Sequence, residues 1–390
     1  MKEIDADIII VGSGLVGLVA AHGLSALNYN VVIIDKKNLF DQNESYKDTR
    51  TVAVSEGSKR FLESLSLWNN LEPYCEPIKT IKVFNRLPKN TISFNNQVKK
   101  NNLGYVIENK IFSQILSKKL QKFSNVKMLF GYDLKNIELK EEYAEAILKK
   151  IKIKSKLIIA ADGKNSDIKK LAGNKTYKKT YSENALVTNF DHKKNLNSTA
   201  YEIFYNTGPL AILPMRSSNN YYKSTVIWSN KPNLLKKLKN SNDKFFLSYV
   251  EETIGSIVGE ITKINSRQIF PLSAHINDSF INKRLIYIGD SAHSIHPIAG
   301  QGWNLGVNDV KNLYKVCKKL NVEMGSSLFC KNYNDLSYNK AFQLFQITDR
   351  LNSHFKKNSD LLRFFSNIGF KLVENKKIIK NELANYAMGI

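Results

Sequence analysis

The sequence predicts an α/β protein in which a parallel sheet is joined to a separate antiparallel sheet and to a helical C-terminal tail. The first 35 residues show the order strand, glycine-rich turn, helix and second strand, which is typical of a parallel βαβ unit. Residues 176–265 change to alternating segments rich in tyrosine and phenylalanine, which indicates an antiparallel sheet. Residues 331–390 contain no glycine-rich break and favour helices.

The N-terminal unit has a glycine pattern with a separate physical reason at each position. The apolar run 7–11 predicts a buried strand and leads directly into Gly12, Gly14 and Gly17. Gly12 permits a tight turn, and Gly14 lets the backbone approach a pyrophosphate. Gly17 lets the next helix, expected over residues 18–27, pack closely on the sheet.

The second strand, residues 31–34, completes the unit and ends on an acid. Asp35 stands about 20 residues beyond the glycines, where dinucleotide folds place the carboxylate that binds a ribose hydroxyl. Arg50 follows the second strand and has the planar, two-point donor geometry that suits a pyrophosphate, although a surface arginine is the alternative. The unit predicts an adenine dinucleotide site, and an ordinary glycine-rich βαβ turn is the competing interpretation.

Composition sets broad limits on the function. The chain of 390 residues is long enough for two joined domains, and its 43% hydrophobic and 24% charged content is ordinary for a globular protein. Its three cysteines are far apart, with no CxxC and no histidine at metal spacing, so we expect neither disulfides nor a metal site. The formal charge of +23 comes from scattered lysines without a nucleic-acid motif. We therefore expect no nucleic-acid partner, and the charge indicates either compositional bias or an anionic membrane surface.

The apolar stretch from Ile8 to Ala26 resembles a membrane span or a signal peptide in hydropathy. The turn glycines Gly12, Gly14 and Gly17 lie within it together with His22, and Glu3, Asp5 and Asp7 stand where a signal peptide has positive charge. We therefore expect a cytoplasmic protein.

The next segments alternate between the two predicted sheets. A helix is expected over residues 58–68 and strands over 78–94, followed by a return to the first domain at 103–123. A β-meander over 126–160 ends in an apolar strand and then in Asp162 and Gly163, at the edge where α/β sheets bind ligands. An ordinary turn is the alternative for this pair. Ser166 is expected to cap a short helix that reaches residue 172.

The aromatic-rich middle of the chain is the candidate substrate domain. Strands are expected at residues 200–205, 210–215 and 222–228, with a turn at Gly208 and Pro209. Ordinary sheet packing explains most of the individual aromatic residues.

A third strand-and-loop element spans residues 285–304 and leads into a helix expected to reach about residue 320. Asp290 ends the strand, where an acid can hold a sugar-like hydroxyl, and the glycine-rich loop offers N–H groups to a negative or electron-rich ligand. His293 and His296 are candidates for a base or metal ligand, but structural roles are favoured because no ligand partner lies nearby in the sequence. The later stretch from Leu361 to Lys380 is apolar and then basic, which is typical of a helix that packs on the domain or meets a membrane.

The three elements in this order resemble the flavin monooxygenases of the para-hydroxybenzoate hydroxylase class, over essentially the whole chain. Within that class, residues 103–109, 208–214, 348–351 and 387–389 are similar to those of the ubiquinone-biosynthesis hydroxylases. The resemblance implies a Rossmann-like FAD-binding domain (1–75, 100–175 and 266–330), an interleaved antiparallel-sheet substrate domain (76–99 and 176–265) and C-terminal helices (331–390).

The resemblance also implies which residues contact the ligands. The expected FAD-binding residues are Gly12, Gly14, Gly17, Asp35, Arg50, Asp162, Gly163, Asp290, Pro297, Gly300, Gln301 and Gly302. The candidate substrate-binding residues are Tyr201, Leu210, Pro214 and His296. No catalytic acid or base stands out in the sequence.

The implied function is hydroxylation of a polyprenylated phenol or quinol in ubiquinone biosynthesis, through a flavin hydroperoxide formed with O2. The electron donor is expected to be NAD(P)H or a reduced carrier protein, and the protein is expected to lie peripherally on the inner membrane, with a biosynthetic complex as a further partner. A soluble catabolic hydroxylase and a flavin-dependent prenyl reductase are alternatives with the same cofactor. A non-catalytic flavoprotein scaffold is the alternative of another class.

Overall fold

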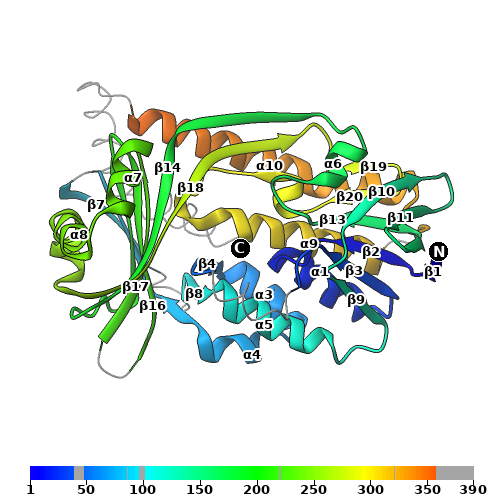
Figure 1. Cartoon of the computed structure of the whole chain (residues 1–390), viewed down its shortest axis with the longest axis horizontal. Helices are drawn as coiled ribbons and strands as arrows, with labels where there is room; N and C mark the ends of the chain where they lie inside the picture. Colours follow the sequence, from blue (N-terminus) through cyan, green and yellow to red (C-terminus); the bar gives the residue numbers. More distant parts are fainter. Residues whose placement is uncertain (39–47, 86, 96–101, 219–220, 320, 357–390) are drawn as a thin grey trace.

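The computed structural model describes residues 1–38, 48–85, 87–95, 102–218, 221–319 and 321–356, and they form two sheet systems connected by long elements (Figure 1). A six-stranded sheet has the order β19-β20-β13-β2-β3-β9, and all its pairs are parallel except β19 with β20. Its strands are β2 (Ile8–Val11), β3 (Val31–Asp35), β9 (Val126–Phe130), β13 (Leu157–Ala160), β19 (Ile281–Asn282) and β20 (Leu285–Tyr287). This arrangement confirms the predicted α/β class.

The described residues also form two smaller sheets. One has the order β1-β12-β11-β10, and the other has the order β4-β8-β5. Their strands are β1 (Lys2–Asp5), β10 (Leu134–Leu139), β11 (Ala144–Leu148), β12 (Ile151–Ser155), β4 (Thr51–Ser55), β5 (Glu76–Ile78) and β8 (Gly104–Glu108). In β12 buried residues alternate with more exposed ones, as the sequence predicts for a sheet with one covered face.

The eight-stranded sheet has the order β21-β18-β14-β17-β16-β15-β6-β7 and is antiparallel except where β15 pairs with β6. Its strands are β6 (Thr80–Asn85), β7 (Leu87–Asn95), β14 (Thr176–His192), β15 (Thr199–Tyr205), β16 (Gly208–Ser218), β17 (Tyr221–Asn230), β18 (Ile261–Asn277) and β21 (His293–Ser294). The predicted strands at 200–205, 210–215 and 222–228 are therefore confirmed. The boundary expected between residues 265 and 266 falls within β18, and the division into domains stays a prediction.

Helices cover these sheets and connect them. The longer helices are α1 (Leu15–Ser25), α3 (Glu56–Ser64), α5 (Asn109–Leu120), α7 (Pro232–Asn240), α8 (Asp243–Val258), α9 (Gln301–Lys319) and α10 (Ser327–Lys356). The short ones are α4 (Trp68–Leu71), α6 (Asp167–Leu171), η1 (Glu72–Tyr74), η2 (Gly289–Ser291) and η3 (Ile298–Gly300). Figure 1 shows α7 and α8 on the outer side of the large sheet, with α9 and α10 running between the two halves.

Two hydrophobic cores correspond to the two halves. The larger core joins the parallel sheet to α1, α5, α9 and α10, with Ile10, Leu18 and Phe112 fully buried. The second core lies between the large sheet and the outer helices, where Leu210 packs in the same cluster as Phe246. None of the described helices is long and apolar enough to cross a membrane.

Three local predictions require correction. The helix expected over 58–68 is divided into α3 and α4, because Ser66 adopts a left-handed conformation with φ +54° between them. Gly208 and Pro209 begin β16 instead of forming the turn, which lies at residues 206–207. The helix predicted over 18–27 begins earlier, at Leu15. The stretch from Leu361 to Lys380 lies outside the described residues.

Gly208 generates a stability prediction because its backbone has φ +136° and a Cβ there would lie 2.5 Å from the Ser229 carbonyl oxygen. We expect Gly208→Ala to lower the free energy of unfolding by roughly 1–3 kcal/mol. Gly255→Ala is the control, because Gly255 lies within α8 with space around it, and alanine there should stabilise by about 0.5–1 kcal/mol. Urea unfolding measures both, and equal stability of the two variants would contradict the interpretation of Gly208.

Candidate functional site

The loops that follow β2, β13 and β20 meet at one edge of the parallel sheet. Parallel pairing places the carboxyl ends of these neighbouring strands side by side. A Cβ built on Gly12 would lie 2.2 Å from the Ala161 carbonyl oxygen, and one on Gly289 would lie 3.2 Å from the Val16 side chain. The structure therefore brings the three sequence-predicted ligand loops into contact.

The three N-terminal glycines have different surroundings. Gly12 has φ +109°, which fits the predicted tight turn. A Cβ on Gly17 would lie 2.1 Å from the Gly12 carbonyl oxygen, so α1 packs closely against the turn itself. A Cβ on Gly14 would meet nothing within 4 Å. Helix α1 has no side-chain cap and no acid in its first turn, so its N–H groups and positive dipole end face open space, as an anion-binding site requires.

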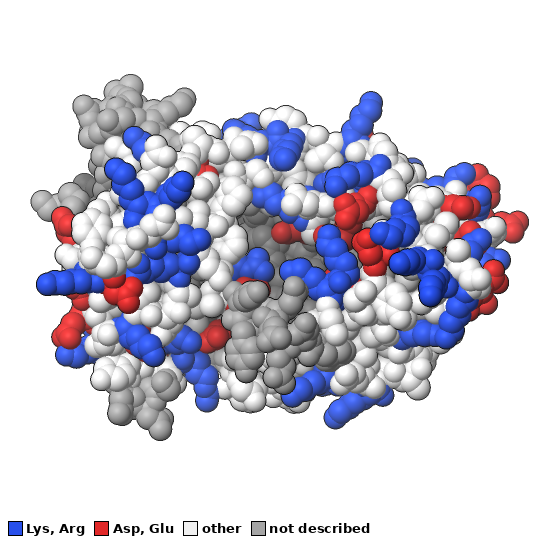
Figure 2. Space-filling model, in the orientation of Figure 1, with Lys and Arg blue, Asp and Glu red and all other residues white. Residues whose placement is uncertain are grey.

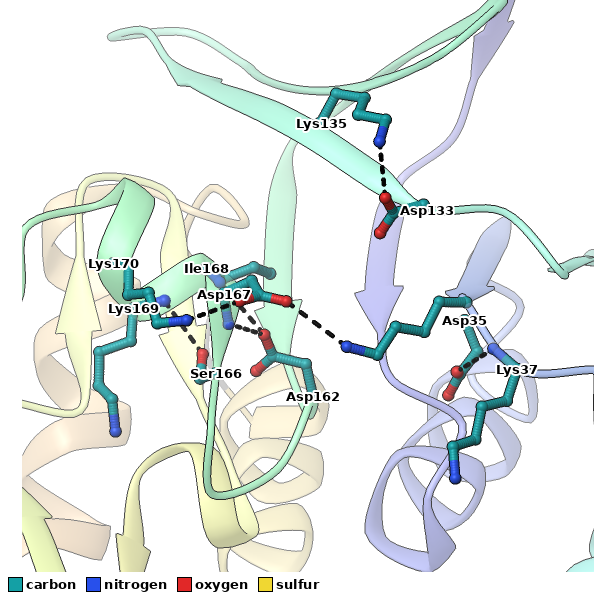
Figure 3. Close-up of polar contacts among 11 residues, drawn as sticks. Asp35, Lys37, Asp133, Lys135, Asp162, Ser166, Asp167, Ile168, Lys169 and Lys170 are labelled. Atoms are coloured by element: carbon teal, nitrogen blue, oxygen red, sulfur yellow. Dashed lines mark hydrogen bonds and ion pairs between the residues drawn. The ribbon is translucent and has the colours of Figure 1, made fainter.

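Asp35 lies at the end of β3 and holds the glycine loop in place. Its Oδ2 accepts hydrogen bonds from the Ser13 N–H at 2.6 Å and the Ser13 hydroxyl at 2.7 Å. Its Oδ1 accepts from the Lys37 N–H at 2.8 Å (Figure 3). A carboxylate has about four lone-pair sites, so these contacts leave acceptor capacity for a ribose hydroxyl.

Asp162 caps helix α6 on the opposite side of the site. Figure 3 shows its carboxylate directed at the start of α6, where Oδ2 accepts from the Asp167 N–H at 2.8 Å and the Ile168 N–H at 3.2 Å. Burial raises the pKa of Asp162, although these hydrogen bonds oppose the rise. Ser166 caps the same helix through the Lys169 N–H, as predicted. Asp162 therefore shapes the edge of the site, and Gly163 follows with open space at its Cβ position.

Asp290 lies in η2, the short helix that follows β20. Asp290 is accessible to solvent, but many protein atoms surround its carboxyl group. This surrounding protein raises the pKa of Asp290, while the charges of His293, Lys164 and Arg50 oppose the rise. Figure 2 shows the molecule hollowed near its centre, with acidic atoms in the hollow and basic side chains around it. The arrangement suits a polar ligand with hydrogen-bond donors.

Arg50 is held at the cleft by an acid on its own segment. Its Nε and Nη2 donate to the two carboxylate oxygens of Asp48 at 2.8 and 2.7 Å, and its guanidinium lies 5.7 Å from the Phe270 ring centroid. The charge of Asp290 also acts on it. The side chain is 52% exposed, so it remains accessible to a ligand.

Asn304, which the sequence analysis did not select, fixes the first turn of α9. Its Oδ1 accepts from the Ser55 N–H at 2.9 Å and the Ser58 hydroxyl at 2.8 Å, and its Nδ2 donates to the Ala53 and Gly300 carbonyls at 2.8 and 3.2 Å. Gly302 has open space at its Cβ position, and the first turn of α9 has no acid. The amide thus holds the loop and helix start against β4 and α3.

An apolar cavity of about 340 Å³ opens between this loop and the large sheet. Its wall includes Ile78, Ile81, Val83, Ile92, Phe94 and Leu213 from the sheet side. Pro297, Gly300, Gln301 and Asn304 line the opposite side, and Glu202 adds a polar side chain. The cavity therefore connects the loop after β20 with an apolar chamber.

Strand geometry decides which of the candidate substrate residues face the cavity. Tyr201 borders the cavity, whereas Leu210 and Pro214 do not, but the Tyr201 ring packs beside Phe84 in the cluster under the outer helices. Side chains alternate between the two faces of β16, so Ala211 and Leu213 face the cavity while Leu210 packs towards the outer helices. The position of Leu210 follows from the register of β16, which short-range sequence patterns do not define.

The two candidate histidines differ in their surroundings. His296 is fully buried, its ring meets that of Tyr181 edge-on at 4.9 Å, and burial lowers its pKa to about 4. Neither of its ring nitrogens has a hydrogen-bond partner among the described residues. His293 instead lies 2.7 Å from Asp309. The described residues contain no group of three or more His, Cys, Asp or Glu side chains suited to a metal ion.

The geometry fits a dinucleotide bound along this edge of the parallel sheet. Gly14 and Gly302 leave space at two helix starts, and Asp290, which is exposed, lies in the turn that follows β20. The donors at the helix starts suit a pyrophosphate and an electron-rich ring, while the carboxylate suits hydroxyl groups.

Known proteins show the same organisation along the whole chain. A ubiquinone hydroxylase of Rhodospirillum rubrum is 26% identical over 98% of this chain and 90% of its own length. The 3-demethoxyubiquinol 3-hydroxylase of Escherichia coli is 26% identical, with 100% of both chains covered. The crystal structure of p-nitrophenol 4-monooxygenase from Pseudomonas putida shares the fold, with a TM-score of 0.79 at 16% identity over 100% of this chain and 99% of that one.

The family described as FAD binding domain matches residues 5–335, which include all three ligand loops. The chain therefore belongs to the FAD-binding domain family, as an FAD-dependent monooxygenase related to the ubiquinone hydroxylases.

Proposed function

We propose that the protein hydroxylates the aromatic ring of a polyprenylated phenol or quinol in ubiquinone biosynthesis. The observation that carries the proposal is the apolar cavity beside the start of α9. Small-molecule sites of about 300–1,000 Å³ are common, so a cavity of this size suits a ring and the first part of a tail. The rest of a long prenyl chain would lie outside. The names of the full-length relatives support this substrate class.

The proposed FAD contacts follow the order of the loops. Gly12, Gly14 and Gly17 place the start of α1 beside the pyrophosphate, with Arg50 as a second donor, and Asp35 accepts from the ribose. Asp162 and Gly163 form the sheet edge beside it. Asp290 accepts hydrogen bonds from the ribitol chain.

The opposite end of the cofactor would meet the loop before α9. Pro297, Gly300, Gln301 and Gly302 border the ring, where the N–H groups and dipole of the helix stabilise negative charge. When bound, FAD supplies the activation of O2 and the transfer of one oxygen atom, with electrons from NAD(P)H or a reduced carrier protein.

The chain's own residues orient the substrate and exclude water. The apolar wall from β6, β7 and β16 holds the ring and tail, while Glu202, opposite Ala211 on the cavity face of β15, is the polar side chain placed to position a ring hydroxyl. Glu202 is only 8% exposed, so water has little access to that part of the wall.

Asp290→Ala tests the cofactor assignment. Loss of a hydrogen bond to a charged acceptor costs roughly 1.5–3 kcal/mol, so FAD affinity should fall by about ten- to a hundredfold. Fluorescence titration of FAD into the apoprotein gives the dissociation constant. Asp133→Ala is the control, because Asp133 is a surface acid of the same half, paired only with Lys135 among the described residues (Figure 3). Unchanged affinity in Asp290→Ala would make that carboxylate structural.

Turnover of matched substrates with and without a prenyl tail tests the proposed function. Burial of one isoprene unit contributes about 2–4 kcal/mol, so removal of the tail should lower kcat/KM at least about thirtyfold. Leu213→Gln on the cavity wall should raise KM for the prenylated substrate, whereas Leu247→Gln, equally half-buried on outer helix α8, should not.

A preference for the tailless phenol would favour a catabolic hydroxylase, and reduction of the tail would indicate a prenyl reductase. No turnover of any phenol by the FAD-loaded protein would favour a scaffold.

Peripheral attachment to a membrane is part of the proposal, because the net charge is +23 and the substrate is a lipid. Each lysine near an anionic surface contributes about 1 kcal/mol, so binding should be strong at low salt and weak at high salt. Co-sedimentation with anionic and with neutral liposomes measures it. Equal and negligible binding to both kinds of liposome at low salt would mean that the net charge is compositional bias. It would also remove the support for attachment to a membrane or to a membrane-bound biosynthetic complex.

A further inference from the structure

A group of buried side-chain oxygens lies where the large sheet meets the segment before β4, and none of them has a hydrogen-bond partner among the described residues. They are Oγ1 of Thr49, Thr51 and Thr225, Oδ1 of Asn189 and Oγ of Ser266. Thr225 is 0% exposed and Asn189 is 3% exposed. A buried polar atom without a partner costs free energy, so a cluster of such atoms points to a ligand that supplies the partners.

Strand pairing places three of these side chains together on one face of the large sheet. Asn189 of β14 pairs with Thr225 of β17 on one side and with Ser266 of β18 on the other. Residues directly opposite each other in antiparallel strands point to the same face, with Cβ atoms about 4.5–5.5 Å apart. The three side chains therefore form one row across the sheet.

This row continues the wall of the apolar cavity. Thr225 pairs with Leu213 and stands two residues before Ile227 on β17, and both of these apolar residues line the cavity. On the facing wall, Thr51 stands two residues before Ala53 on β4, and Ala53 also lines the cavity. The unpartnered oxygens thus extend both walls at the same end of the cavity.

Two polar contacts join the walls at this end. The Asn189 side-chain amide donates to the Thr49 carbonyl oxygen at 2.7 Å, and Lys223 Nζ lies 2.9 Å from the Glu108 carboxylate. Lys223 precedes the row by two residues on β17, and Glu108 lies opposite Thr51 in the pairing of β8 with β4. The two contacts therefore frame the buried hydroxyl groups and close this end of the cavity.

The cluster carries no formal charge. Its four hydroxyl groups can each donate and accept a hydrogen bond, whereas the amide oxygen of Asn189 only accepts. The cations beside it are already paired with acids, Lys223 with Glu108 and Arg50 with Asp48. The set therefore suits a neutral group that both donates and accepts, such as a hydroxyl, and disfavours a carboxylate, whose charge these paired cations do not balance.

We propose that this polar end of the cavity binds a second, neutral oxygen substituent of the aromatic ring, at a distance from the hydroxyl that Glu202 positions. The substrate class then narrows to phenols with a further hydroxyl or similar neutral oxygen group, and hydroxybenzoates are disfavoured. The inference rests on the proposed function, because it takes the occupant of the cavity to be an aromatic ring.

The separation of the two polar contacts fits one ring. Glu202 pairs with Ala211, and Ala211 pairs with Ile227, so Glu202 and Thr225 are two strands and two residues apart on one face. With about 4.8 Å between strands and about 3.4 Å per residue, their Cα atoms lie about 12 Å apart. This span leaves room for an aromatic ring with a hydrogen-bonding group at each end.

Thr225→Val tests the proposal, because valine keeps the shape of threonine and removes only the hydroxyl. The FAD-loaded, full-length protein is titrated with three prenylated phenols that carry a second hydroxyl, a hydrogen or a carboxylate at the same ring position. Changes in flavin absorption give each dissociation constant without turnover. Wild-type protein should bind the hydroxyl probe about tenfold more tightly than the hydrogen probe, and the carboxylate probe most weakly. Thr225→Val should abolish the hydroxyl preference, and Thr225→Ser should keep it.

Thr188→Val is the matched control. Thr188 is 0% exposed and adjoins Asn189 on the opposite face of β14, where its hydroxyl donates to the Ser266 carbonyl oxygen at 2.7 Å. Because this hydroxyl is paired, Thr188→Val should lower the urea midpoint of the apoprotein and leave the binding of all three probes unchanged. Thr225→Val should leave the urea midpoint unchanged or raise it, because the hydroxyl that it removes is unpaired.

Several results would overturn the proposal. One is an equal effect of Thr225→Val on the hydroxyl and hydrogen probes, or no effect on either. Another is weaker FAD binding by Thr225→Val with unchanged probe affinities, which would make the cofactor the occupant. A third is a urea midpoint lowered as much as in Thr188→Val, with no hydroxyl preference in the wild type, which would assign the oxygens to internal water. If Thr225→Val does not fold, Thr51→Val on the facing wall is tested in the same way.

Tailless versions of the three probes separate this inference from the proposed function. A hydroxyl preference without any gain from the tail would support the polar end of the cavity and refute a prenylated substrate. A gain from the tail without a hydroxyl preference would refute the polar end alone.

Discussion

The loops after β2, β13 and β20 pack so closely that added side-chain atoms do not fit between them, and the site depends on this close packing. A Cβ at Gly12 would overlap the backbone at Ala161, and one at Gly306 in α9 would lie 2.8 Å from Val16 and 3.1 Å from the Gly289 Cα. Because backbone packs against backbone here, α1 and α9 approach the same sheet edge closely. Their starts therefore lie at the same edge of the sheet, which is the arrangement that the proposed cofactor contacts require.

The second half of the molecule is attached to this edge by continuous elements. Strands β14 and β18 run the length of the large sheet and pair with each other from Thr176 to His192. Asn304 connects α9 to β4 and α3, which border the cavity. The edge with the three ligand loops and the apolar wall consequently share neighbouring elements, and in the proposed complex these elements set the distance between the substrate ring and the loop before α9.

The features that local sequence patterns predict are those in which neighbours along the chain interact. The βαβ unit, the Ser166 cap and the three ligand loops all depend on short-range order, and the structure contains each of them. Asn304 was missed as a site residue because its partners, Ser55 and Ala53, lie far away in the sequence. Leu210 was selected although the register of β16 turns it away from the cavity. Register is set by pairing between strands, so a single strand's composition does not determine it.

The order of strands in the parallel sheet has a consequence for biogenesis. Strand β2 pairs with β3 soon after both leave the ribosome, but its other edge pairs with β13 at residues 157–160, and β13 in turn pairs with β20 at 285–287. Strand β6 pairs with its neighbour β7 early, but its other edge pairs with β15, which is made much later. A growing chain therefore exposes unpaired, apolar strand edges through most of its synthesis, and long-range parallel pairing forms slowly. Recovery of active protein should accordingly depend on temperature and chaperone supply during translation more than on the stability of the finished fold.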